Sequence, residues 1–217
     1  MSTFRALFIK ELKVVFRGRS LIGTGLGLAI TLSATVGIVL SSSVSPKVAA
    51  VLYWLILIFS ASEILSHTFI AEEEQGTGDQ LRLRVNYSLV YLAKLSSCII
   101  FILTVALVVF PLLTLWLGLP LSKLGLIGLI GLIGCPALAL CQGFTSYLLS
   151  KGKGQATLYP LIIMPIILPI LISLVLLTAQ VIEGLAISLN LFIVVGAQSL
   201  SMLVLGIVLM PYIEESL

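Results

Sequence analysis

The sequence predicts an all-α integral membrane protein with six transmembrane helices and an N-terminal amphipathic helix at the membrane interface. Its composition, its long apolar runs and its distribution of charge lead to that fold class. Of the 217 residues, 59% are hydrophobic and 10% are charged, whereas soluble domains are about 45–50% apolar and about 25% charged. A soluble fold of this composition would have too little polar surface, so we expect lipid to be its solvent.

Six apolar runs are long enough to cross a bilayer, which takes about 20 residues of helix. They cover residues 21–40, 48–70, 89–117, 124–149, 157–179 and 189–210. The first run exceeds the apolar region of a secretory signal, about 7–15 residues, so we expect it to be a retained helix. The connections are short, and residues 1–217 are expected to form a single transmembrane domain.

The basic residues predict the orientation. If the N-terminus is cytoplasmic, ten of the twelve lysines and arginines lie on the inner side, and only Lys47 and Lys123 lie on the outer side. Cytoplasmic loops carry the excess of positive charge in membrane proteins. Both termini are therefore expected to be cytoplasmic.

Residues 4–17 have the pattern of an amphipathic helix lying on the membrane surface. One face gathers large apolar side chains: Phe4, Leu7, Phe8, Leu12 and Val15. Lys10, Lys13 and Arg17 gather on the opposite face, whereas Glu11 falls within the apolar one. A carboxylate in that position either snorkels or pairs with a nearby basic residue, or it contacts the helix bundle or a partner. The first interpretation is preferred because surface helices often carry one misplaced charge.

Glycines and prolines distinguish two of the predicted spans. Four glycines open the fourth span at three-residue spacing: Gly125, Gly128, Gly131 and Gly134. Such residues allow helix backbones to approach closely in lipid. Pro160, Pro165 and Pro169 in the fifth span remove helical hydrogen bonds and are expected to kink or loosen it. The three cysteines lie inside apolar runs and are expected to be buried packing residues.

An acidic segment follows the second span and is the most informative part of the chain. It contains four of the nine acidic residues, together with Gly76 and Gly78, which permit a sharp turn. Acidic residues contribute little to membrane topology, so insertion does not explain them. By composition, the segment is either a solvated loop or a docking surface for a cytoplasmic partner.

The residues of this segment resemble the E-x-x-x-G-[TS]-x-[DE]-x-L signature of ABC-2 transporter permeases. In that class, the segment forms a coupling helix that docks on an ATPase subunit. The resemblance implies an ABC-2 permease-like fold with a cytoplasmic coupling loop at residues 71–88. The positions that match the signature are Glu72 or Glu73, Gly76, Thr77, Asp79 and Leu81.

Three further stretches, at residues 8–17, 90–94 and 159–169, are similar to the CcmB family, haem exporter protein B of cytochrome c maturation. The resemblance implies a permease subunit of an ATP-driven complex in the bacterial cytoplasmic (inner) membrane. Haem would be cargo rather than a tightly bound cofactor, and ATP would bind the partner. Implied partners are a CcmA-like ATPase, CcmC-like and CcmD-like membrane subunits, the CcmE-like haem chaperone and possibly a second copy of the chain, but no nucleic acid.

The residues leave two other functions open, and they indicate no catalytic site. An ABC-2 permease for another amphiphile, such as a drug, lipid or glycan, fits the pattern, as does a membrane scaffold without a translocation path. The run from Lys151 to Gly154 lacks the G-x-x-x-x-G-K-[ST] spacing of a phosphate-binding loop. The chain is therefore not expected to hydrolyse ATP itself.

Glu63 and His67 are ionisable residues inside the second span. They lie four positions apart and share one helix face. A structural pair is the favoured interpretation, with a role in transport, haem ligation or subunit contact as alternatives. Because His67 is the single histidine, no metal or haem site with two histidine ligands is expected within the chain.

Overall fold

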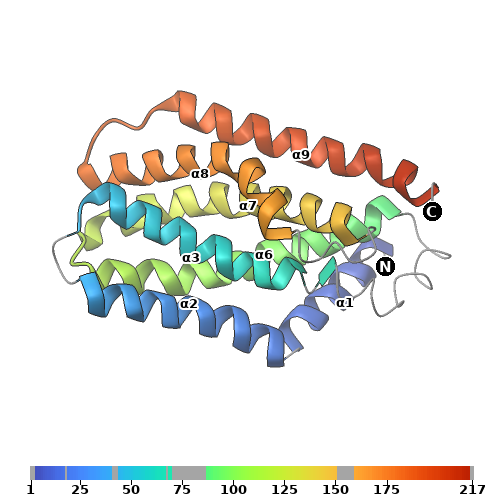
Figure 1. The fold of residues 1–217 in the computed structure, drawn as a ribbon, viewed down its shortest axis with the longest axis horizontal. Coiled ribbons are helices and arrows are strands. Elements are labelled where there is room, and N and C mark those ends of the chain that lie inside the picture. Colours follow the sequence, from blue (N-terminus) through green and yellow to red (C-terminus); the bar gives the residue numbers. More distant parts are fainter. Residues whose placement is uncertain are drawn as a thin grey trace.

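The computed structural model describes residues 3–17, 19–40, 44–66, 68–69, 87–150 and 159–215, and all regular structure in these ranges is helical. Figure 1 shows an elongated bundle with both ends of the chain at the same end. The helices are α1 (Thr3–Arg17), α2 (Arg19–Leu40), α3 (Pro46–Ser66), α6 (Tyr87–Trp116), the 3₁₀ turn η2 (Leu121–Lys123), α7 (Leu124–Ser150), α8 (Tyr159–Glu183) and α9 (Leu189–Glu215).

The predicted fold class is confirmed. Six of the described helices, α2, α3, α6, α7, α8 and α9, are long and apolar enough to cross a membrane. Helices suit lipid because they satisfy their own backbone hydrogen bonds where no water is available to do so. The even number of crossings agrees with the position of the two chain ends in Figure 1.

Two helices end in a left-handed glycine, and one of these ends corrects a predicted boundary. Gly184 has φ 76°; its amide bonds to the Val181 carbonyl at 3.2 Å, and the Leu185 amide bonds to that of Gln180 at 2.9 Å. This arrangement satisfies the last carbonyls of a helix. α8 therefore extends one turn beyond the apolar run 157–179. The helix ends where the backbone turns at Gly184, not where the run of apolar side chains ends.

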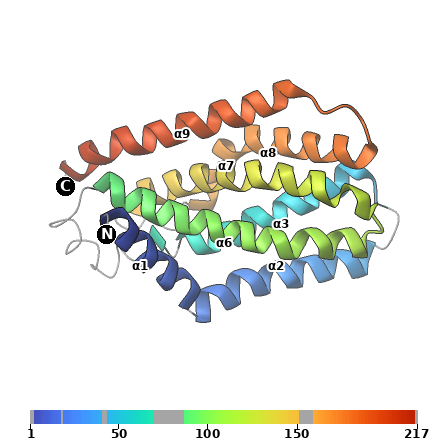
Figure 2. The same ribbon diagram turned by 180° about the vertical axis from the view of Figure 1, so that it is seen from behind.

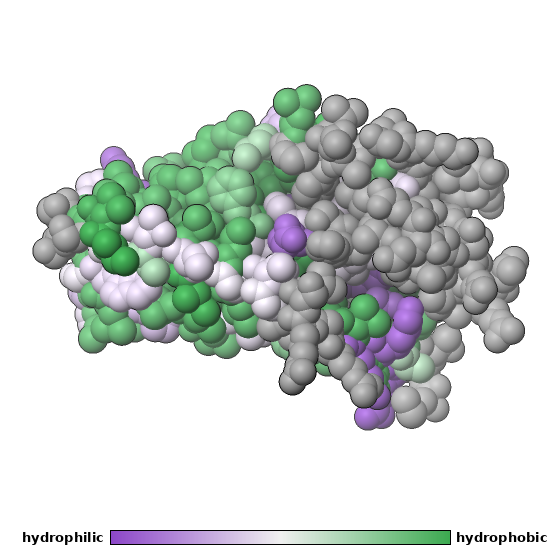
Figure 3. Space-filling view, turned by 60° about the horizontal axis from the view of Figure 1, so that its bottom comes forward, coloured by the Kyte–Doolittle hydropathy of each residue, from purple (hydrophilic) through white to green (hydrophobic). Residues whose placement is uncertain are grey.

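Helix α7 contacts α3, α6, α8 and α9, and most of its buried residues lie in its C-terminal half. Figures 1 and 2 both place α2 and α9 at opposite edges of the bundle. The spans of α2 and α9 are the least buried of the six, at 17% and 11%. Figure 3 shows hydrophobic surface over the body of the molecule and hydrophilic side chains near the end that carries α1.

The glycines of α7 divide into two pairs. A Cβ atom at Gly131 would lie 2.6 Å from the Phe110 ring, and one at Gly134 would collide with the Trp54 ring. Gly125 and Gly128 have no described atom within 4 Å of that position. Aromatic side chains therefore lie against the second pair alone, and close approach of helix backbones at these glycines stays a prediction.

Helix α8 continues through two of its prolines. Pro165 and Pro169 lie inside the helix, although neither has an amide to donate. The Gln198 side chain of α9 donates a 2.7 Å hydrogen bond to the Ile166 carbonyl in the intervening turn. A neighbouring helix thus supplies a hydrogen bond to the segment between the two prolines, and the expected kink or loosening of α8 stays a prediction.

The N-terminal helix is confirmed as α1, and it packs against α6 and α2. Leu7, Glu11 and Val15 are its buried residues, whereas Phe4 is exposed. The side that faces the bundle is therefore centred on Glu11. Its position at the membrane surface stays a prediction.

Candidate functional site

The predicted coupling residues, Glu72, Glu73, Gly76, Thr77, Asp79 and Leu81, lie outside the described residues, as does His67. The structure does describe what flanks the acidic segment. α3 ends at Ser66, Thr68 and Phe69 follow in a π-helical turn, and α6 begins at Tyr87. We call the group of Thr68, Phe69, Tyr91, Lys94, Cys98 and Tyr147 the base of the acidic segment.

Lys94 of α6 connects the two flanks of the acidic segment. Its amine donates a 3.1 Å hydrogen bond to the Thr68 carbonyl and lies 5.3 Å from the centre of the Phe69 ring. Carbonyls at the end of a helix lack intrahelical partners, and a cation is stabilising there. A cation over an aromatic ring adds about 0.5–2 kcal/mol. One side chain thus holds the exit of α3 against the first turns of α6.

Thr68 adds a second connection between the same two elements. Its hydroxyl donates to the Ile64 carbonyl at 2.8 Å, and the Cys98 thiol of α6 lies 3.8 Å from the Thr68 hydroxyl oxygen. A thiol is a weak donor, so this contact contributes less than the lysine bond. All three cysteines are buried free thiols, as predicted.

Three aromatic rings, each from a different element, pack against one another at the base. The ring centre of Phe69 lies 6.0 Å from that of Tyr91 on α6 and 6.5 Å from that of Tyr147 on α7. The two tyrosine rings are 5.9 Å apart. Aromatic pairs at such distances contribute about 0.5–1.5 kcal/mol beyond the area that they bury. The rings therefore tie α7 to both flanks of the acidic segment.

Polar side chains of α7 fix the last turns of α3. The Gln142 amide donates to the Ile58 carbonyl at 3.1 Å and to the Ser62 hydroxyl at 3.0 Å. One turn later, the Ser146 hydroxyl donates to the Leu65 carbonyl at 3.0 Å. Hydrogen bonds of this kind contribute about 0.6–2 kcal/mol between transmembrane helices. The helix that leads into the acidic segment is thus attached along its final two turns.

Glu63 and Glu11 are the two carboxylates that the sequence placed near this end. Glu63 is half-buried in α3; its predicted pairing with His67 lies outside the described residues. Glu11 is 2% exposed, and the Lys10 amine lies 2.9 Å from its Oε1 atom. Both interpretations of Glu11 therefore hold, because it pairs with a lysine and also lies inside the bundle.

Sequence reasoning did not single out the base. Lys94 was counted among the inner positive charges, although it lies within the predicted span 89–117. An ionisable residue inside a span is itself a signal of a specific partner, and that signal was available. The partners, Thr68 and Phe69, belong to another helix, so no local pattern identifies them.

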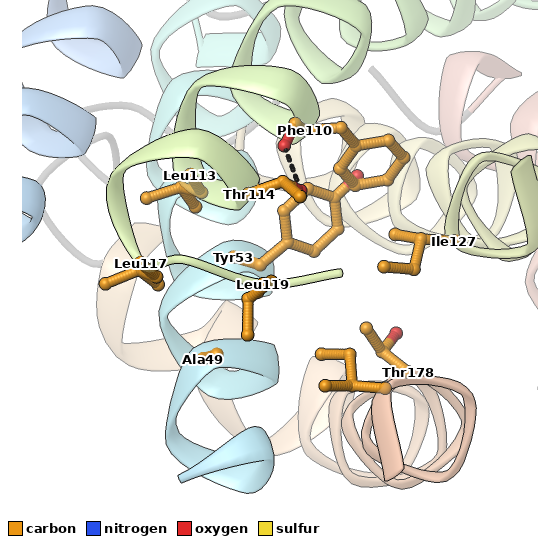
Figure 4. Close-up of a pocket in the computed structure, with 10 residues that line it drawn as sticks. Ala49, Tyr53, Phe110, Leu113, Thr114, Leu117, Leu119, Ile127 and Thr178 are labelled. Carbon is orange, nitrogen blue, oxygen red and sulfur yellow. Dashed lines mark hydrogen bonds between the residues drawn. The ribbon is translucent and has the colours of Figure 1, made fainter. Parts of the chain in front are cut away.

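A cavity of about 20 Å³ lies at the opposite end of the bundle. Figure 4 shows its side chains converging from α3, α6, α7 and α8, with the Tyr53 ring beside that of Phe110 and the Thr114 hydroxyl bonded to the Phe110 carbonyl. The cavity has room for about one water molecule. Among the described residues, no group of three or more histidines, cysteines, aspartates or glutamates is placed to bind a metal ion.

Fold and site together define a multi-pass, all-helical membrane protein in which contacts join its second and third spans on either side of the acidic segment. The sequence model described as CcmB protein matches residues 2–213. The chain belongs to the CcmB family. That family comprises permease subunits of the haem-exporting ABC system of cytochrome c maturation, which includes an ATPase partner. A comparison with curated proteins gives no match at the threshold applied.

Proposed function

We propose that the chain is the transmembrane permease subunit of an ATP-driven complex that handles haem during cytochrome c maturation. The complex would contain a CcmA-like ATPase together with CcmC-like and CcmD-like membrane subunits. Its work would be haem export or release of the haem-loaded, CcmE-like chaperone. Family membership over residues 2–213 and six apolar helices support this proposal.

The single observation that carries the mechanism is the base of the acidic segment. A permease subunit without its own ATPase receives energy only through contact. Lys94 and the three aromatic rings fix both flanks of residues 71–88 to α3, α6 and α7. A partner that pushes on this segment would therefore move three spans together, rather than bend a loose loop.

Deletion of this chain tests the biological function. The deletion strain should lack holocytochrome c while it still makes the apoprotein, and the wild-type chain should restore it. Normal haem attachment in the deletion strain would leave a permease for another amphiphile as the better interpretation. An ATPase that fails to copurify with the wild-type chain would favour a scaffold instead.

The proposed orientation places both termini, and residues 71–88, on the cytoplasmic side of the bacterial inner membrane. Single cysteines at Ser122, in η2 between α6 and α7, and at Gln75, in the acidic segment, test this placement. In a background with the native cysteines replaced, a membrane-impermeant maleimide should label the former in intact spheroplasts and the latter only after lysis. Reversed labelling of the pair would contradict the orientation.

A further inference from the structure

Helix α8 is weakened along one stretch by its prolines. Pro165 and Pro169 lie inside the helix and have no amide hydrogen, so the carbonyls one turn earlier, those of Leu161 and Pro165, lose their helical donors. We call residues 161–169 the proline segment. Just beyond it, the Ser173 hydroxyl donates to the Pro169 carbonyl at 3.0 Å, a contact that often bends helices. We therefore expect α8 to bend within the proline segment at a lower cost than elsewhere.

The direction of that bend follows from burial. Pro165 and Pro169 are exposed, whereas Ile163, Ile167 and Ile170 on the other side of the helix are buried. A proline ring clashes with the carbonyl one turn earlier, so a helix opens on the side that carries the ring. Helices that curve in proteins are also convex on the outside and wrap around the core. A bend in the proline segment therefore moves one end of α8 toward or away from the bundle.

Gln198 of α9 is hydrogen-bonded to the middle of the proline segment. α8 and α9 lie side by side at one edge of the bundle (Figure 1), and the Gln198 amide donates to the Ile166 carbonyl at 2.7 Å. Packing of two apolar helices needs no glutamine, because a buried amide costs free energy unless it is paired. The outer part of α8 is fixed separately, since the Trp54 indole of α3 donates to the Thr178 hydroxyl at 2.9 Å. α8 is thus bonded to α9 at the proline segment and to α3 beyond it.

We infer that the proline segment is a hinge at which α8 bends during the ATP-driven cycle, and that Gln198 is the positioning residue that fixes this hinge against α9. The half of α8 beyond the hinge stays attached to α3 through Trp54, while the half that begins at Tyr159 changes its angle. This inference rests on the proposed function, because ATP in the partner drives the bending. It assigns the movement to α8 and the support of the hinge to α9.

Pairs of spin labels on one helix measure its bending directly. In a background with the native cysteines replaced, Leu161→Cys and Leu176→Cys carry labels on either side of the two prolines, at exposed positions. Ile193→Cys and Val208→Cys, with the same spacing on α9, are the control pair. The full permease–ATPase complex in lipid nanodiscs is measured by pulsed electron paramagnetic resonance, first without nucleotide and then with a non-hydrolysable ATP analogue.

Substitution at position 198 tests the support of the hinge. Gln198→Met removes the amide at similar volume. Gln198→Asn, whose amide falls short of the Ile166 carbonyl, takes its place if the methionine variant does not fold. Gln180→Met is the matched control, because the Gln180 amide donates to the Ser188 hydroxyl at 2.9 Å, at the far end of α8. Melting temperatures are recorded for all variants, since a merely structural role would make both methionine variants alike.

We expect the α8 pair to give a narrow distance distribution in each nucleotide state, with a different mean in the two, and the α9 pair to keep one mean. Gln198→Met should at least double the width of the α8 distribution without nucleotide and lower holocytochrome c formation at least five-fold. Gln180→Met should match wild type in both respects. An α8 distance that does not change with nucleotide, or a width that Gln198→Met leaves unchanged, would overturn the inference.

Failure of the hinge and failure of the proposed function give different results. An ATPase that does not copurify with the wild-type chain contradicts the proposed function and the inference with it. A complex that hydrolyses ATP and supports cytochrome c maturation, but gives equal α8 distances in both nucleotide states, contradicts the hinge alone.

Discussion

The two ends of the bundle are held together by different means. At the end with the chain termini, several contacts are directional, among them the Lys94 amine on the Thr68 carbonyl in the base and, beside the base, the Ser146 hydroxyl on the Leu65 carbonyl. Toward the far end, aromatic rings fill space that glycines leave open, as where Trp54 meets Gly134. The small cavity beside Tyr53 lies there too.

The two kinds of contact serve two purposes, stability in the far half and coupling at the base. Apolar helices gain little from contact with one another in lipid, because the lipid tails are as apolar as they are. The far half relies on rings packed against glycines and on the hydrogen bond that the Trp54 indole donates to Thr178. A larger side chain at such a glycine would therefore cause a steric clash. The base instead fixes particular backbone carbonyls next to the acidic segment. We therefore expect changes at the far half to affect stability, and changes at the base to affect coupling to the ATPase.

The largest expected effect on stability is at Gly134. Gly134→Val would place methyl groups inside the Trp54 ring, and Trp54 is held by its 2.9 Å hydrogen bond to Thr178. Overpacking of this kind costs about 1–3 kcal/mol or more. Gly128→Val is the matched control, since its side chain would meet open space. Melting of the two purified variants should show a large loss for the first and little for the second; equal melting temperatures would refute the comparison.

A marked loss of coupling, beside a loss of stability, is expected at the base. Lys94→Met removes the amine and leaves the Thr68 carbonyl without that donor. Hydrogen bonds to charged groups contribute about 1.5–3 kcal/mol. Recovery of the ATPase with this variant should fall several-fold, whereas Lys123→Met, at the far end, should leave recovery unchanged. Loss of recovery in both variants, or in neither, would show that the two ends do not differ as described.

The smallest effects are expected from the hydroxyls of Tyr53 and Tyr91. Both are buried, and neither has a hydrogen-bond partner within the described ranges. Tyr53→Phe and Tyr91→Phe therefore relieve an unpaired polar group and should keep or slightly raise the melting temperature. Leucine at either position should lower it, because the ring contacts are lost. A clear drop for Tyr91→Phe would reveal a partner for that hydroxyl.

The sequence predicts the spans well because each depends on composition alone. Runs of about 20 apolar residues have few structural solutions in lipid, and all six were located. The predicted helix ends were less accurate where backbone geometry determines them. α8 continues past the end of its apolar run and ends only at the left-handed turn of Gly184.

The candidate site was only partly predictable, because its contacts join residues far apart in sequence. A helical wheel placed Glu11 on the apolar face but does not show that α6 covers that face. Lys94 is a charge within a predicted span, but its partner Thr68 lies 26 residues earlier, and the sequence alone does not connect the two. The aromatic rings of Phe69, Tyr91 and Tyr147 come from three elements, and no local period connects them.

The acidic segment itself remains the prediction on which the account depends. Its glycines permit a turn, its carboxylates suit basic groups on a partner, and Leu81 suits an apolar socket. Exposed ion pairs contribute about 0–1 kcal/mol each, whereas buried anchors dominate interfaces. We therefore expect Leu81→Asp, or Gly76→Val, to release the ATPase far more than Glu74→Ala does.

Copurification of the ATPase with Leu81→Asp, beside Glu74→Ala and wild type, tests the central claim most directly. Expression and membrane insertion are measured in parallel, so that loss of the ATPase is not confused with loss of the permease. The account predicts that the ATPase is largely lost from Leu81→Asp and mostly retained by Glu74→Ala. Equal recovery from Leu81→Asp and wild type would contradict the assignment of residues 71–88 as the coupling element.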